Sequence, residues 1–589
     1  MLELILTFFI IGLGPALSCM GRHFSTRELL IFAPVLGYAI TVIVGVYLTL
    51  LNIPAEQWAW DYTWIAIAIS LLMCTISRVT WCQIWQNNQL LLLFYALVIL
   101  LLTLPMISGG INFTVLRGNG TDAFNYMTMA GFLQHEPLSL LKFASFQELL
   151  DKHASYPLAK ELLTERWATA LIFAYYSILA KIPLYQADYS YSLVFFILSS
   201  GLFYLWLNTI TKQRWLVFLL AITCVCGFWA QFILDIRAMS QMSALPVMLM
   251  FNYLFAKTEK MPISVALISA LLLASIVLLY VELIPIMFVA CGLYTIINLT
   301  YNKNIQALNV ICGILIVSLV LLIPTIGFLQ LFFKKQMHIA ATNINNWHQA
   351  YFSWLYDYHI MGFWGLGPFT LNPIAVTIGN LFAALLSIPF IRCLLTFWRH
   401  NNKRYLVLST CYAWSGISLF IFLFAKGQYW AAGKALSFVY PFFIVSLLAG
   451  IELFKSRKLR SLTTNLLLLW LISQLFLAII RTPLAIMKRD FPHYIYGHGY
   501  YRQHDFSAKP FQNIACKGII IDIKDGWLQE YFNFVFGWQY PIYNLHGVLD
   551  RSNHIIGTQK KQSFDCLLRK KSTQSKFPKQ NKEFTLIRI

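Results

Sequence analysis

Asp122 is the first residue whose surroundings point to chemistry. It lies in the stretch RGNGTDAFNYMTMAGFL, where the glycines permit a tight backbone and the residues that follow predict a helix beginning close to Asp122. A carboxylate in this position has two interpretations. It can cap the N-terminus of the helix, or it can act as a general base that takes a proton from a hydroxyl group. The local sequence favours neither.

Glu282 is the second such residue, in the stretch LLYVELIP between two strongly apolar segments. An ionised carboxylate is costly in apolar surroundings, so we treat this position as a candidate for function by default. The alternative is structural, because Glu282 could simply pair with Arg237 or with a lysine.

Both residues lie in a chain that is too apolar for an ordinary soluble protein. Of 589 residues, 59% are hydrophobic and 12% are charged, whereas soluble domains have about 25% charged residues. The apolar residues come in blocks, and a helix needs about 20 residues to cross the hydrocarbon core. The sequence therefore predicts an all-α polytopic membrane protein with about 14 transmembrane helices. The expected spans are roughly 3–20, 28–50, 63–80, 88–107, 189–210, 215–231, 241–256, 262–280, 283–300, 307–330, 371–391, 405–425, 435–453 and 461–481.

The connections between these spans alternate between basic and acidic. The basic connections include those with Arg22, Lys212 and Lys455, and the net charge of +20 comes largely from such loops and the C-terminal tail. Positively charged loops stay in the cytoplasm, which puts the N-terminus and the acidic loops outside. Two lysine pairs are exceptions that fall outside: Lys334 with Lys335, and Lys426 with Lys434. No motif for nucleic acid is visible.

The order of spans and loops divides the chain into three parts. Residues 1–87 hold the N-terminal transmembrane helices, and residues 88–481 form a module with long outside loops at 108–188 and 331–370. The segment 158–180 is apolar but interrupted by charge, so we expect an interfacial or re-entrant helix. Residues 482–589 form a small extracytoplasmic α/β tail in which GIIIDI predicts a strand.

The tail contains two cysteines, Cys516 and Cys566. An oxidising compartment would permit a disulfide between them. The remaining cysteines show no CxxC pattern of a metal or redox site.

The loop with Asp122, followed by SYPLAKELLTERW, resembles the first extracytoplasmic loop of the GT-C superfamily of membrane glycosyltransferases. That superfamily includes protein O-mannosyltransferases and the aminoarabinose transferase that acts on lipid A. In this resemblance Asp122 matches an aspartate that follows a span, and Tyr156, Pro157 and Leu158 match a later segment close to "PPL", with one proline missing.

The resemblance assigns further residues. Asp235 in FILDIRAMSQ matches a second acidic position, and the stretch FAKGQYWAAGKALSFVYPFF is similar to the "AKGK…Y…P" stretch of the aminoarabinose transferase. Lys426 and Lys434 match there and, with Arg237, would bind the phosphate of a lipid-linked donor.

These matches imply transfer of a sugar from a polyprenyl-phosphate donor to a lipid, glycan or protein acceptor on the outer face of the cell (inner) membrane. Asp122, Asp235 and Glu282 would be the catalytic carboxylates. Their oxygens would also suit Mg²⁺ or Mn²⁺, so a metal requirement stays open. The alternatives are an O-antigen-type polymerase or ligase, and a lipid or solute transporter. A transporter would show charges inside spans and paired repeats, whereas here the charges lie at span ends.

Overall fold

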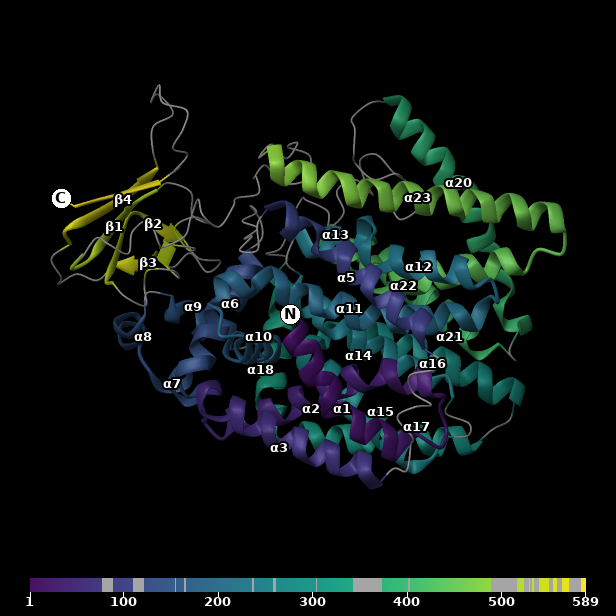
Figure 1. Cartoon of the computed structure of the whole chain (residues 1–589), viewed down its shortest axis with the longest axis horizontal. Helices are drawn as coiled ribbons and strands as arrows, with labels where there is room; N and C mark the ends of the chain where they lie inside the picture. Colours follow the sequence, from purple (N-terminus) through teal and green to yellow (C-terminus); the bar gives the residue numbers. More distant parts are fainter. Residues whose placement is uncertain are drawn as a thin grey trace.

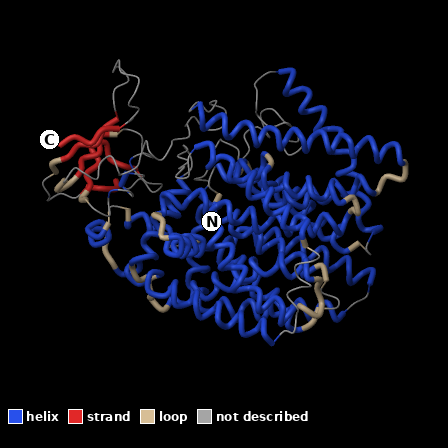
Figure 2. Tube along the Cα trace, in the orientation of Figure 1, coloured by secondary structure: helices blue, strands red, loops and turns tan. Residues whose placement is uncertain are grey.

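The structure is a computed structural model of the whole chain. It describes residues 1–76, 88–109, 121–153, 155–163, 166–235, 238–257, 261–302, 305–342, 373–400 and 403–488. In the tail it describes 516–523, 529, 532–533, 536, 540–549, 555–558, 564–570 and 584–588. The helices pack into one large bundle, and the strands form a sheet to one side of it (Figures 1 and 2).

The first half of the bundle mixes long helices with short ones. The long helices are α1 (Leu2–Met20), α2 (Thr26–Leu50), α3 (Ala55–Ile76), α5 (Gln89–Gly109) and α11 (Leu184–Ile210). The shorter helices before α11 are α6 (Thr121–His135), α7 (Leu138–Phe143), α8 (Phe146–Lys152), α9 (Tyr156–Leu162) and α10 (Trp167–Ala180).

The second half consists mainly of long helices joined by short turns. They are α12 (Arg214–Cys226), α13 (Phe228–Asp235), α14 (Met239–Phe255), α15 (Ile263–Tyr280), η2 (Val281–Leu283), α16 (Ile284–Asn302), α17 (Ile305–Leu322), η3 (Ile323–Thr325), α18 (Ile326–Thr342), α20 (Pro373–Thr396), η4 (Phe397–His400), α21 (Arg404–Ala425), α22 (Tyr429–Glu452) and α23 (Arg457–Lys488).

Ten helical stretches within the described residues are long and apolar enough to cross a membrane. They include α1, α2, α3, α11, α21 and α22, and a continuous stretch that joins α15 to α16. The chain is therefore a multi-pass membrane protein built from helices. The count of about 14 spans stays a prediction, because α5 and α14 are helices at predicted spans but are absent from these ten.

Polar contacts define two opposite ends of the bundle. At one end, Nζ of Lys257 lies 3.1 Å from Oε1 of Glu28, at the start of α2, and the Ser264 hydroxyl donates to the Cys19 carbonyl. At the other end, Arg166 pairs with Glu282. We call these the Glu28 end and the Glu282 end. Because α15 has Ser264 at the Glu28 end and Tyr280 at the Glu282 end, it runs the full depth of the bundle.

The α15–α16 stretch is a hairpin with Glu282 at its turn. The Tyr294 hydroxyl in α16 donates to the carbonyl of Ala256, directly before Lys257 of the Glu28 end. The hydroxyl of Ser415 donates to the carbonyl of Ile286, near the start of α16. Helix α16 therefore returns to the Glu28 end, as the two predicted spans flanking Glu282 require.

The helices at two predicted spans have boundaries that differ from those expected. Helix α3 begins at Ala55 rather than at 63, so Asp61 lies inside this helix and not in a loop. The span predicted at 307–330 lies within the helical stretch Gln306–His338, which is long and apolar enough to cross a membrane. Inside this stretch a turn of 3₁₀ helix that contains Pro324 separates α17 from α18. A proline cannot donate the backbone hydrogen bond that would continue the helix. The predicted loop at 331–370 accordingly begins with helix, and its residues 343–370 lie outside the described part.

The segment 158–180 is two helices rather than one. Helix α10 begins after Arg166 at the Glu282 end, and its side chains from Trp167 to Ser177 are buried in the bundle. Near its far end the Tyr176 hydroxyl accepts a hydrogen bond from the Met1 amino group at 2.7 Å. Met1 directly precedes α1, at the end opposite Cys19, so α10 has both of its ends at the Glu282 end. We did not expect this burial among other helices, and an interfacial or re-entrant position of α10 stays a prediction.

The tail contains a five-stranded sheet of order β3-β2-β1-β4-β5. Its strands are β1 (Ile519–Asp522), β2 (Ile542–Leu549), β3 (Ile555–Thr558), β4 (Cys566–Lys570) and β5 (Phe584–Arg588). Strand β1 is parallel to β2 and to β4, and β3 and β5 are antiparallel to their neighbours. A disulfide joins Cys516 to Cys566, at the start of β4.

Candidate functional site

An ion pair lies at the turn of the α15–α16 hairpin. Nη2 of Arg166 is 3.4 Å from Oε1 of Glu282, and only 16% of the Arg166 side chain and 24% of the Glu282 side chain are exposed. The turn forms because α15 stops at Tyr280, whose backbone is not helical (φ −159°, ψ 79°). Pro285 in the first turn of α16 is compatible with a helix start. The carboxylate of Glu282 therefore lies on a short turn between two helices, at the Glu282 end of the bundle.

Two cations flank the ring of Tyr280. The guanidinium carbon of Arg166 is 5.2 Å from the ring centroid, and Nζ of Lys434 is 5.3 Å from it. Tyr280 itself is fully buried. Attraction to an aromatic ring holds a cation in place without neutralising it. We call Arg166, Tyr280, Glu282 and Lys434 the charged cluster.

The charged cluster carries one net positive charge on two cations and one carboxylate. It brings together three segments distant in sequence: the start of α10, the turn η2, and the second turn of α22. Oε2 of Glu282 is buried and makes no hydrogen bond within the described part of the chain. A buried acceptor without a partner is costly, so this oxygen is available to a ligand or an ion. Arginine and lysine are the residues that bind phosphate groups.

A buried network of hydroxyl groups lies next to the charged cluster. Oγ1 of Thr169, one turn after Arg166, is 3.2 Å from Oγ of Ser240 and 3.0 Å from Oγ of Ser243. Oη of Tyr126 is 2.5 Å from Oγ of Ser240. The network therefore ties α6, α10 and the first turn of α14 together at the Glu282 end.

A second set of polar contacts ties α22 to the same region. Oγ of Ser437, one turn after Lys434, accepts hydrogen bonds from Nε1 of Trp229 at 3.0 Å and from Nε2 of Gln241 at 2.9 Å. These three residues lie in α22, α13 and α14. Because each donor is buried and paired, the position of the helix that carries Lys434 is well defined.

The backbone brings the two predicted aspartates to this end of the bundle. Asp122 is the second residue of α6, one turn before Tyr126. Asp235 is the last residue of α13, five positions before Ser240. Their side chains, and the whole of Arg237, lie outside the described part. Of the six predicted site residues, Glu282 and Lys434 have described side chains in the charged cluster. Asp122 and Asp235 lie on α6 and α13, two helices with polar contacts to α14 and α22 at this end.

Lys426 behaves differently from Lys434. It follows the last residue of α21, before Gly427, and its side chain is exposed. Within the described residues it makes no contact with the Tyr280 ring, whereas Lys434 does. The structure therefore separates the two lysines that sequence reasoning grouped together.

Sequence reasoning missed Arg166 and Tyr280. We expected Glu282 to pair with Arg237 or with a lysine, and its described partner is Arg166. A signal was present in the sequence, since Arg166 interrupts an otherwise apolar segment and Tyr280 lies two positions before Glu282. The contact itself joins residues more than a hundred positions apart, which no local pattern can reveal.

Three side chains with atoms that could bind a metal lie together in the described residues: Cys516, Asp565 and Cys566. The two cysteines form the disulfide, so this group does not hold a metal ion. Among the predicted carboxylates, only the side chain of Glu282 is described.

The sequence matches no family model, and it has no significant match among curated proteins. The function must therefore be argued from the chemistry of the charged cluster and its place in the bundle.

Proposed function

We propose that the chain is a glycosyltransferase with a GT-C-like arrangement. It would transfer a sugar from a polyprenyl-phosphate donor to an acceptor on the extracytoplasmic face of the cell (inner) membrane. The single observation that carries this proposal is the charged cluster at one end of an apolar helical bundle. Two cations meet there with a carboxylate that has one oxygen unpaired within the described residues.

The distribution of charge supports the extracytoplasmic face. Basic residues gather at the Glu28 end. Tyr253 contacts Glu28 there, next to Lys257, and it also contacts Tyr405, which follows Arg404. Arg460 pairs with Glu452 at the same end. Positively charged loops stay in the cytoplasm, so the charged cluster would face outward. A disulfide in the tail is expected in an oxidising compartment, and this agrees with a tail on the outer side.

The proposed reaction needs a base and a site for phosphate. Lys434, together with Arg166, would bind the phosphate of the donor. Asp122 would take the proton from the acceptor hydroxyl as its oxygen forms a bond to the anomeric carbon. The bond between the anomeric carbon and the phosphate oxygen breaks, and polyprenyl phosphate leaves with the electron pair. Asp235 and Glu282 would orient the acceptor. Their oxygens would also suit a divalent cation, although no step described above requires one.

The test of this proposal is the substitution Asp122→Asn in a strain that lacks the native gene. The amide can cap α6 about as well as the carboxylate, but it cannot accept the proton, and loss of a general base costs about 10²–10⁴ in rate. The measurement is transfer of label from polyprenyl-phosphate sugars to membranes of the deletion strain, with protein level determined in parallel.

Asp61→Asn is the matched control, because Asp61 is an exposed carboxylate of α3 that the proposed reaction does not use. Transfer should be normal in this variant. If Asp122→Asn retains full transfer at a normal protein level, Asp122 is only a helix cap and the proposed base is wrong.

A further inference from the structure

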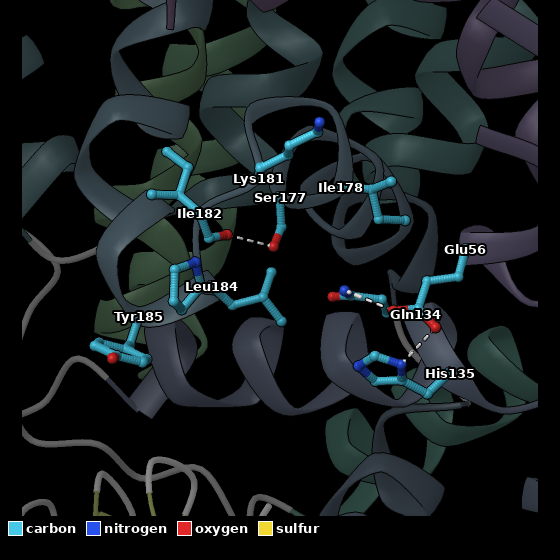
Figure 3. Close-up of a pocket in the computed structure, with 10 residues that line it drawn as sticks. Glu56, Gln134, His135, Ser177, Ile178, Lys181, Ile182, Leu184 and Tyr185 are labelled. Atoms are coloured by element: carbon cyan, nitrogen blue, oxygen red, sulfur yellow. Dashed lines mark hydrogen bonds and ion pairs between the residues drawn. The ribbon is translucent and has the colours of Figure 1, made fainter. Parts of the chain in front are cut away.

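A cavity of about 460 Å³ lies at the Glu282 end but far from the charged cluster. It is lined by the ends of α6 and α10, the start of α3, and the turn that leads into α11 (Figure 3). Helix α10 runs from beside Arg166 to Lys181 at the cavity, a distance of about 22 Å at 1.5 Å per residue. The cavity is therefore a separate site, and its volume is in the range of small-molecule sites.

The charged groups of the cavity have opposite signs. Oε2 of Glu56 lies 2.8 Å from Nδ1 of His135, and Nε2 of Gln134 lies 3.5 Å from Oε1 of Glu56. Lys181 lines the cavity from a different element, the turn after α10 (Figure 3). Its Nζ lies 6.0 Å from the centroid of the Trp60 ring. A ligand in this cavity would meet a carboxylate and an ammonium group.

The backbone at Lys181 is unusual for a lysine. Its φ of 52° is left-handed, and in the described part of the chain the other non-glycine residue with positive φ is Asn52. Lys181 terminates α10, with the amide of Ile182 donating to the carbonyl of Ser177, a position where glycine is usual. Residues in strained conformations cluster at functional sites. A lysine in this conformation indicates that its amino group has a functional role, such as binding a ligand.

Helix α3 leads from the cavity along a face suited to lipid. Glu56, Trp60 and Trp64 are spaced four residues apart and share one side of the helix. Trp64 is 64% exposed, and Ile65 and Ile69, further along the helix, are exposed as well. Tryptophan is enriched where a span leaves the hydrocarbon core. The cavity thus lies at headgroup level, directly above an apolar face.

We propose that this cavity binds the headgroup of a zwitterionic phospholipid with a primary amine, which is the chemistry of phosphatidylethanolamine. The phosphate would lie at Lys181, the ammonium group at Glu56, and the acyl chains along α3. Glu56 would repel a purely anionic headgroup, and a choline headgroup has no N–H to donate to the carboxylate. The inference is independent of the proposed transferase activity.

The experiment is native mass spectrometry of the delipidated full chain, titrated separately with phosphatidylethanolamine, phosphatidylglycerol and phosphatidylcholine. The wild type should bind phosphatidylethanolamine most tightly. Lys181→Gly should weaken that binding about tenfold, the effect of losing one charge-assisted hydrogen bond. Glycine relaxes the left-handed backbone, so this variant should melt at the same temperature or higher, and loss of binding cannot be ascribed to misfolding.

Two further variants make the result decisive. Glu56→Gln should remove the preference for phosphatidylethanolamine over phosphatidylglycerol. Lys152→Gln is the control, because Lys152 pairs with Glu136 outside the cavity, and it should bind like the wild type. The proposal is overturned if Lys181→Gly binds phosphatidylethanolamine as the wild type does. It is also overturned if the wild type binds phosphatidylglycerol or phosphatidylcholine equally well.

Discussion

At the scale of single residues, Lys434 and Glu282 differ in what each can do. The ammonium group of Lys434 lies against the Tyr280 ring, and a lysine is a point charge that suits a phosphate group. Glu282 shares one oxygen with Arg166 and has the other without a partner in the described residues. In the proposed reaction, the cation would therefore serve the phosphate of the donor and the carboxylate would serve the acceptor.

This division predicts the effect of Lys434→Met. Methionine keeps most of the length of the side chain and its contact with Tyr280, but it has no charge to offer the donor phosphate. We expect the KM for the polyprenyl-phosphate donor to rise about tenfold or more, with a smaller change in kcat. Steady-state kinetics with varied donor gives both values.

Lys426→Met is the comparison for this variant, since Lys426 is exposed beyond the end of α21. Its KM for the donor should change much less. An unchanged donor KM in Lys434→Met at a normal protein level would remove Lys434 from the phosphate site.

At the scale of elements, local hydropathy and charge predicted where helices lie in the sequence and where they are interrupted. Within the described residues the predicted spans are helical, although those at 215–231 and 307–330 are each divided between two helices. The break at Glu282 was visible because a carboxylate separates two apolar runs. The burial of α10 was not predictable, because its depth depends on contacts such as the hydrogen bond between Thr63 and Tyr175 at 2.6 Å. The pairing of Arg166 with Glu282 was missed for the same reason. Periodicity fixes the type of an element but not its neighbours.

At the scale of the whole molecule, the two ends of the bundle should lie on opposite sides of the membrane. Gln147 in α8 is exposed near the Glu282 end, and Lys212 is exposed at the Glu28 end. We expect a single cysteine at 147, in a background without the other free cysteines, to react with an impermeant maleimide in intact cells. A cysteine at 212 should react only after lysis. The reverse pattern would put the charged cluster in the cytoplasm and exclude extracytoplasmic transfer.

The central claim for the whole molecule is that transfer takes place at the charged cluster, and Glu282→Gln tests it most directly. The amide preserves the shape of the side chain but removes the negative charge that pairs with Arg166 and that would contact the substrate. Glu136→Gln is the matched control, because it also removes one carboxylate of an ion pair, with Lys152 at 2.8 Å, away from the cluster.

The measurement is transfer of label from the donor to acceptor membranes, at equal amounts of each variant, with Glu282→Asp included as the conservative change. We predict that Glu282→Gln lowers the rate by about 10² or more. Glu282→Asp should recover part of that loss, and Glu136→Gln should transfer at the wild-type rate. Transfer at the wild-type rate by Glu282→Gln, in protein that is inserted and folded, would contradict the account.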